Sequence, residues 1–214
     1  MPMTAQDTVR TLLARAGTGY AAEAGIRLAD KPAPLYQLLM LAQLLSIRIS
    51  ARIAVAAARE LRESGYTTPH HVAEAEWSDL VAALGRAHYV RYDESTATRL
   101  IANAAELIER WHGDMRGLAT ESGHDPAALA ELLQGFRGIG PVGADIYLRE
   151  VQDTWTWLRP YFDERARRGA RDLGLPTDPA ALAALAPAGH DAELAAALVR
   201  VTLDHGLKDD LRIG

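Results

Sequence analysis

The pattern of hydrophobic and polar positions along the chain is helical almost throughout. Apolar residues recur every three to four positions, and the alternation typical of strands is nearly absent. Thr-Pro and Asp-Pro pairs mark helix starts, and glycines mark several helix ends. The sequence therefore predicts an all-α fold with about ten helices.

The sequence shows no internal repeat and no low-complexity linker between the predicted helices. The helical segments occupy residues 1–17, 34–65, 68–86, 93–114, 125–136, 163–175 and 178–207. A further helix runs from a glycine hairpin to Gln152. The second of these segments breaks near residues 46–50 and is expected to hold two helices joined by a polar turn. A Trp-rich connector separates Gln152 from the next helix, and the last segment holds a pair.

Composition narrows the class of protein. With 214 residues, of which 49% are hydrophobic, the chain can bury a real core. No apolar run approaches the roughly 20 residues of a membrane span, and residues 1–17 are typical of an amphipathic helix rather than a leader. We therefore expect a cytoplasmic, bacterial nucleoid-associated monomer with no membrane partner. The absence of cysteine excludes disulfides, thiolate zinc sites and cysteine-ligated iron–sulfur clusters.

The charge distribution limits how the chain can meet nucleic acid. The formal net charge is −5, which is the wrong sign for a general nucleic-acid binder, so any DNA contact must come from a local patch. Such a patch is predicted among arginines of the stretch 149–171: Arg149, Arg159, Arg165, Arg167, Arg168 and Arg171. The alternative is a solvated helix face that is balanced by interspersed acidic residues.

The glycine hairpin lies in residues 132–151, LLQGFRGIGPVGADIYLREV. Gly138 and Gly140 permit positive φ angles and a close backbone approach, as a tight turn requires. The helix that follows presents free amides, which can bind a phosphate oxygen without a positive side chain. Gly143 and Ala144 are small enough to let two helices pack closely. The alternative is an ordinary helix turn with glycine caps.

This motif resembles the helix-hairpin-helix of the endonuclease III (HhH-GPD) superfamily of DNA glycosylases. In that family a connector and an aspartate follow the hairpin, and here Asp163 lies 23 residues after Gly140. The resemblance extends upstream through residues 35–61 and 84–114 and covers roughly residues 30–175. The family's four-cysteine cluster loop is missing, as it is in some members. The resemblance implies a central helical domain at 30–149 that ends in the hairpin, and a second domain, without an iron–sulfur cluster, at 1–29 plus 150–214.

The resemblance also implies an activity, base excision from double-stranded DNA. Asp163 would stabilise the oxocarbenium character of the sugar and orient the attacking water, although it is equally suited to cap a helix. Val142 occupies the position of the lysine that forms a Schiff base in bifunctional members. We therefore expect a monofunctional glycosylase without AP-lyase activity. The alternatives are a non-catalytic relative that binds distorted DNA, and a helical interaction protein with no DNA role.

The remaining candidate residues belong to DNA contacts. The family fills the gap left by an extruded base from two loops, which correspond here to the turn with Arg48 and the loop with His88 and Tyr89. Tyr89 and Tyr92 either stack on a base or pack in the core. No cofactor is expected, although the hairpin could bind a monovalent cation. The sequence does not identify the substrate base. The predicted DNA contacts are Gly138, Gly140, Val142, Gly143, Arg48, His88, Tyr89, Arg165 and Arg168.

Overall fold

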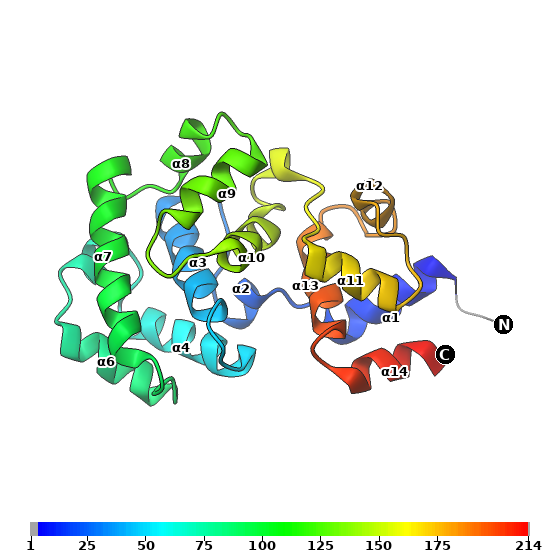
Figure 1. The fold of residues 1–214 in the computed structure, drawn as a ribbon, viewed down its shortest axis with the longest axis horizontal. Helices are drawn as coiled ribbons and strands as arrows, with labels where there is room; N and C mark the ends of the chain where they lie inside the picture. Colours follow the sequence, from blue (N-terminus) through cyan, green and yellow to red (C-terminus); the bar gives the residue numbers. More distant parts are fainter. Residues whose placement is uncertain (1–3, 214) are drawn as a thin grey trace. The chain divides into compact units, whose positions relative to one another are not determined.

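The computed structural model describes residues 4–213, which form helices and connecting loops (Figure 1). Fourteen α-helices and one short 3-10 helix occupy these residues, so the predicted all-α class is confirmed. The helices that the sequence pattern missed include α2 (Tyr20–Glu23), α8 (Arg116–Glu121) and α14 (His205–Ile213). The first two are too short to show a helical period. None of the helices in the described range is long and apolar enough to cross a membrane.

The chain divides into two compact units. The core unit consists of residues 21–148, and the terminal unit joins residues 1–20 to residues 149–214. The sequence-based division placed its boundaries at 29/30 and 149/150. Helix α10 (Pro141–Val151) contains the second boundary, so it contributes residues to both units. The functional roles expected for the two domains remain predictions.

The core unit is built around α3 (Pro32–Leu45), a helix that is apolar on nearly every side. Such a helix is stable only when other elements surround it. It packs against α4, while α7 packs against α5 and α6, and α8 packs against α9. The bounds of these elements are α4 Ala51–Glu63, α5 Pro69–Ala73, α6 Trp77–Arg86, α7 Asp93–Trp111 and α9 Pro126–Gln134.

The terminal unit is built in the same way around α13 (Asp191–Val201), most of whose residues are buried. Helices α1 (Ala5–Ala16), α11 (Glu164–Asp172) and α14 pack against it. The first and last helices of the chain therefore share one hydrophobic core, to which Leu12, Leu198 and Leu211 contribute. The unit also contains the 3-10 helix η1 (Thr156–Leu158) and α12 (Pro179–Ala183).

Side-chain caps fix the starts of several helices. The Ser50 hydroxyl accepts a hydrogen bond from the amide of Ile53 at 3.3 Å, and the Asp125 carboxylate accepts one from the amide of Ala128 at 2.8 Å. Such caps satisfy amides that have no partner inside the helix. Local sequence thus sets where these helices begin, and burial around α3 and α13 decides how they pack.

Gly169 allows α11 and α13 to cross closely. A Cβ atom built on Gly169 would lie 2.0 Å from the carbonyl oxygen of Leu198, which is far inside the contact distance of real atoms. The two helices must therefore separate if any side chain is added here.

We expect Gly169→Ala to lower the free energy of unfolding by about 1–3 kcal/mol, the usual cost of overpacking. Gly85→Ala in α6 is the matched control, because no atom lies within 4 Å of its built Cβ, and it should add about 0.5–1 kcal/mol. Urea denaturation of both variants measures the difference. Equal stability of the two would contradict the close crossing.

Candidate functional site

The hairpin between α9 and α10 is a tight turn held by two buried side chains. The amide of Ile139 donates to the carbonyl of Phe136 at 3.0 Å. Gly138 has φ +82°, which suits glycine in the third position of such a turn. Phe136 and Ile139 are buried, and the Phe136 ring lies 5.8 Å from the ring of Trp111, centroid to centroid. The predicted tight turn between two helices is therefore present.

Asn103 of α7 holds the peptide groups at the tip of this turn. Its Oδ1 accepts from the amide of Arg137 at 2.8 Å, and its Nδ2 donates to the carbonyl of the same residue at 3.0 Å. Nδ2 also donates to Oε1 of Gln43 in α3 at 2.9 Å. Because Asn103 is only 2% exposed, these bonds form away from water and fix the hairpin against the core of its unit. The sequence pattern gave no sign of this residue.

Gly138, Gly140, Val142 and Gly143 all lie on the hairpin or at the start of α10, as predicted. Gly140 is not among the residues with positive φ, which corrects the conformation expected for it. Instead, its built Cβ would meet no atom within 4 Å, so this point of the backbone is open. A built Cβ on Gly143 would lie 3.2 Å from Cγ2 of Ile139, so this glycine permits close packing.

The first amides of α10 point to an open end of the helix. Ala144 donates to the carbonyl of Gly140 at 3.0 Å, but no acceptor within the described chain pairs with the amides of Gly140, Val142 or Gly143. Val142 is 49% exposed. Unpaired amides and the helix dipole together make this end attractive to an anion.

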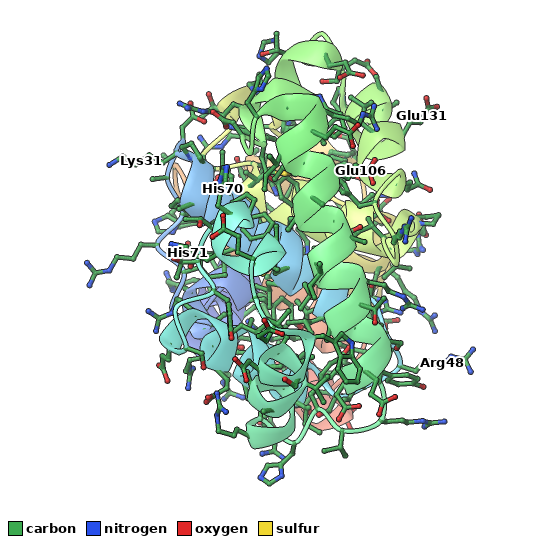
Figure 2. The ribbon with its side chains drawn as sticks, turned by 90° about the vertical axis from the view of Figure 1, so that its left-hand side faces the viewer. Lys31, Arg48, His70, His71, Glu106 and Glu131 are labelled. Atoms are coloured by element: carbon green, nitrogen blue, oxygen red, sulfur yellow. The ribbon has the colours of Figure 1, made fainter. Side chains whose placement is uncertain are left out.

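Three arginines of the core unit belong to or adjoin the hairpin. The Arg99 side chain lies against Gly138, whose built Cβ would be 3.0 Å from Arg99 Cδ. Arg137 is an exposed residue of the turn itself. Arg48 is exposed and extends into solvent (Figure 2). It follows two residues after Ser46, whose hydroxyl lies 2.8 Å from the Gln43 carbonyl and 3.2 Å from the Gly138 carbonyl. Over residues 4–213, none of the three arginines forms a salt bridge. Sequence reasoning missed Arg99 and Arg137.

The carbonyls of the hairpin are mostly engaged within the protein. Those of Phe136 and Arg137 accept hydrogen bonds from Ile139 and Asn103. That of Gly138 lies 3.2 Å from the Ser46 hydroxyl, whose shorter contact is with the Gln43 carbonyl at 2.8 Å. Each keeps one lone pair, so a monovalent cation at the hairpin stays a prediction. Within the described part of the chain, no group of three or more His, Cys, Asp or Glu side chains could hold a metal ion.

Asp163 caps α11 and forms a buried ion pair. One carboxylate oxygen accepts from the amide of Ala166 at 2.8 Å, and the other accepts from the guanidinium of Arg149. The side chains of Asp163 and Arg149 are 2% and 4% exposed. The helix cap expected for this residue, which is compatible with a catalytic role, is therefore present. The ion pair was not foreseen, because Arg149 had been assigned to a surface patch.

Gln152 fixes the connector just before Asp163. Its Oε1 accepts from the amide of Tyr161 at 2.8 Å, and its Nε2 donates to the Tyr161 carbonyl at 2.9 Å. Gln152 is fully buried, and the nearby connector residues Trp155 and Phe162 are buried as well. The position of the carboxylate is therefore set by a cap, an ion pair and a rigid connector.

The loop between α6 and α7 differs from expectation at one residue. His88 is exposed, with φ +60°, but Tyr89 is fully buried and its hydroxyl faces Thr96. Burial raises the pKa of Tyr89. Tyr89 therefore packs in the core and does not present its ring to a base. Val90, which sequence reasoning passed over, is 64% exposed.

The predicted arginine patch separates into paired and unpaired members. Arg149 pairs with Asp163, Arg159 with Asp153, and both Arg167 and Arg171 with Glu164. Within the described residues, Arg165 and Arg168 have no acidic partner, and both are exposed. The patch available to a ligand is therefore smaller than the sequence indicated.

Comparisons with known proteins find one structural similarity. No protein-family model matches the sequence, and no curated protein matches it. A solved structure of a trapped endonuclease III–DNA covalent intermediate, an estranged-adenine complex, is similar with a TM-score of 0.49 and 16% identity. The match covers 92% of this chain and 85% of that one.

We expect Asn103→Ala to loosen the hairpin, because the amide and carbonyl of Arg137 would lose their partner. The free energy of unfolding should fall by about 1–3 kcal/mol, and the Arg137 amide should exchange hydrogen faster. Gln134→Ala is a suitable control, since its side chain bonds only to the Ala130 carbonyl on an exposed face, and it should change stability by less than about 0.5 kcal/mol. Unchanged exchange at Arg137 would refute the role of Asn103.

Proposed function

We propose that this chain binds the sugar-phosphate backbone of double-stranded DNA through the hairpin between α9 and α10. The observation that carries the proposal is the set of unpaired amides at Gly140, Val142 and Gly143, held in place by Asn103. A phosphate oxygen there would receive hydrogen bonds from rigid donors, with the helix dipole adding to the attraction. Backbone donors carry no sequence information, so this contact would position DNA without reading its bases.

The surrounding charges support the same ligand. Within residues 4–213, Arg48, Arg99 and Arg137 form no salt bridge, so three unpaired guanidinium groups lie at or beside the hairpin although the whole chain has a net charge of −5. A guanidinium can bind a phosphate through two parallel hydrogen bonds. The open space at Gly140 leaves room for the backbone of a ligand to approach.

Gly140→Val tests the hairpin contact. The variant should fold, because its built Cβ meets nothing and its φ is not positive. It should weaken duplex binding about tenfold or more at every sequence, the loss expected for charge-assisted hydrogen bonds. Fluorescence anisotropy with several duplexes measures this, and Gly85→Val is the control at an open glycine on α6. If folded Gly140→Val binds as well as the parent, the hairpin is not the contact.

A second candidate function is hydrolytic removal of a damaged or mismatched base, with Asp163 as the catalytic carboxylate. The observation that favours it is that the Asp163 carboxylate is buried in an ion pair, although burying a charged pair costs free energy. Replacement of a buried ion pair by apolar residues is often neutral or stabilising, so stability alone gives little reason for one. The carboxylate is nevertheless held by Arg149, by the cap at Ala166 and, through the connector, by Gln152. Such positioning is what a charged group near a developing sugar cation requires.

The same contacts define what this reaction would need. With both oxygens engaged and the side chain 2% exposed, the carboxylate reaches a substrate only if Arg149 or the connector moves. The guanidinium would otherwise oppose the positive charge that develops on the sugar. Base excision would therefore be coupled to a rearrangement on DNA binding, whereas backbone binding at the hairpin would not.

The arrangement of amines favours a monofunctional enzyme if the chain is catalytic. Val142, two residues after Gly140, presents an apolar side chain where a Schiff-base lysine would be needed. The chain has two lysines. Lys31 is exposed immediately before α3 (Figure 2), and Lys208 of α14 pairs with Asp172 at 3.0 Å.

Asp163→Asn separates the two functions. Asparagine still caps a helix, but it removes the charge. The activation free energy of base release should therefore rise by on the order of 3 kcal/mol or more, while duplex binding stays intact. Removal of one partner of a buried pair also costs about 3–5 kcal/mol of stability. Activity must therefore be compared below the melting temperature of the variant.

The assay uses duplexes that carry alkylated, deaminated, mismatched or oxidised bases, followed by alkali to reveal abasic sites. Strand cleavage should appear only after alkali, and borohydride should trap no covalent adduct. Efficient trapping would contradict the monofunctional assignment. Unchanged base release by Asp163→Asn would remove this residue from the mechanism. A parent that binds DNA but releases no base would leave the binding function alone, and failure to bind any duplex at low salt would favour an interaction protein.

A further inference from the structure

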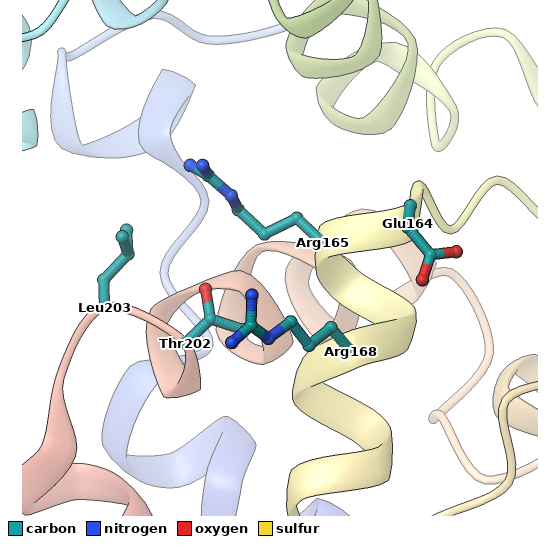
Figure 3. A pocket seen from close by; sticks show the side chains of 5 residues that line it. All are labelled: Glu164, Arg165, Arg168, Thr202 and Leu203. Atoms are coloured by element: carbon teal, nitrogen blue, oxygen red, sulfur yellow. The ribbon is translucent and has the colours of Figure 1, made fainter.

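A second basic site lies in the terminal unit, on α11. Arg165 and Arg168 line a cavity of about 300 Å³ together with Glu164, Thr202 and Leu203. The two arginines are one helical turn apart, so their side chains leave α11 on the same face. They extend toward Thr202 and Leu203, which follow the end of α13 (Figure 3).

The acidic residue at this cavity is neutralised by other partners. Glu164 points away from Arg165 and Arg168 (Figure 3), and its two carboxylate oxygens bind Arg171 at 2.6 Å and Arg167 at 2.8 Å. The hydrogen bond from Arg171 and the charge of Arg167 lower the pKa of Glu164. Within residues 4–213, neither Arg165 nor Arg168 forms a salt bridge, so the cavity faces a ligand with two cationic side chains that no ion pair engages.

The other wall of the cavity is largely uncharged. The Thr202 hydroxyl donates to the Val199 carbonyl at 2.7 Å, so its proton is already used. Leu203 is 56% exposed and offers an apolar surface beside the arginines. Two guanidinium forks next to an apolar wall match a phosphodiester joined to a sugar better than they match a cation or an apolar ligand.

We propose that this cavity binds a backbone phosphate of DNA, so that the terminal unit makes a phosphate contact of its own in addition to the hairpin. The inference rests on the proposed DNA-binding function and deepens it. It assigns the contact to Arg165 and Arg168, excludes the paired arginines of the same helix, and adds Thr202 and Leu203 as the opposite wall. The alternative role for the two arginines is to stabilise the carbonyl end of α13.

The salt dependence of duplex binding tests the proposal. The slope of log K against log salt is negative, and its magnitude is called the slope here. Removal of one arginine that binds a phosphate should lower this magnitude by about 0.9, so Arg165→Gln/Arg168→Gln should lower it by about 2. Between about 50 and about 200 mM salt, the affinity of the variant should accordingly fall about tenfold less than that of the parent. Arg165→Lys/Arg168→Lys keeps the charge and should keep most of the slope.

The matched control removes the same charge from the same unit. Arg10→Gln/Arg15→Gln alters two arginines of α1 that already pair with Asp7 at 2.6 Å and Asp210 at 2.9 Å, and it should leave the slope near that of the parent. A slope lowered equally by both double variants would overturn the proposal, because the effect would then be one of total charge. Circular dichroism and thermal melting confirm that each variant is folded.

The remaining outcomes separate this proposal from the hairpin. If Gly140→Val weakens binding while Arg165→Gln/Arg168→Gln keeps the slope of the parent, the cavity is not a contact and the proposed function stands. If the reverse holds, the hairpin is not a DNA contact and the cavity is one.

Titration with inorganic pyrophosphate, followed by NMR of the arginine side chains, tests whether the cavity binds a free phosphate. Pyrophosphate binding at Arg165 and Arg168 without any change in the DNA slope of the double variant would assign the cavity to another ligand and overturn the proposal. Lower thermal stability with unchanged DNA binding would do the same in favour of the α13 carbonyls.

Discussion

The hairpin depends on one buried amide side chain, that of Asn103. A turn cannot pair all of its own peptide groups, and a buried peptide group without a partner is costly. Asn103 answers this constraint by bonding to both the amide and the carbonyl of Arg137, while Gln43 accepts its remaining amide hydrogen. The turn is thereby attached to α7 and α3 of the core unit, with Phe136 and Ile139 as apolar anchors. The open amides that follow are rigid because this support lies beneath them.

The terminal unit uses the same device with the opposite result. Gln152 brackets the peptide group of Tyr161 as Asn103 brackets that of Arg137, and Asp163 follows two residues later. At the hairpin this support leaves donors exposed, whereas at the connector it places an acceptor that Arg149 and Ala166 then occupy fully. The amides of the hairpin are therefore available without any rearrangement of the chain. The aspartate has two possible roles. It either stabilises the unit through its ion pair with Arg149, or it becomes available after that ion pair opens.

The sequence predicted the elements that depend on local rules. The helix starts at Asp125 and Asp163 follow from capping chemistry, and the positive φ of Gly138 follows from the needs of a tight turn. Positions 138–143 were identified as one hairpin for the same reason.

What the sequence did not predict depends on contacts between distant residues. Asn103 lies 34 residues before the peptide group that it holds, and no periodicity marks it. Arg149 could not be told from an exposed arginine until Asp163 was found against it, 14 residues further on. Tyr89 and Val90 are neighbours, but one is fully buried and the other is 64% exposed, which a loop sequence does not reveal. Gly140 was correctly placed in the hairpin. The positive φ expected for it is wrong, whereas the space around its built Cβ is compatible with the close backbone approach that was also expected.

The electrostatics of this chain are governed by pairing and not by total charge. Most of the arginines in the stretch 149–171 are engaged by carboxylates, and a paired guanidinium offers little to a phosphate because its donors and its charge are already used. The arginines at the hairpin and the two at the α11 cavity lack such partners within the described residues, so they retain both. An acidic protein can bind an acidic polymer in this way, provided that its carboxylates lie beside other arginines. Arg165 and Arg167 lie two residues apart on α11, but Glu164 binds Arg167, whereas Arg165 forms no salt bridge within the described residues and lines the cavity.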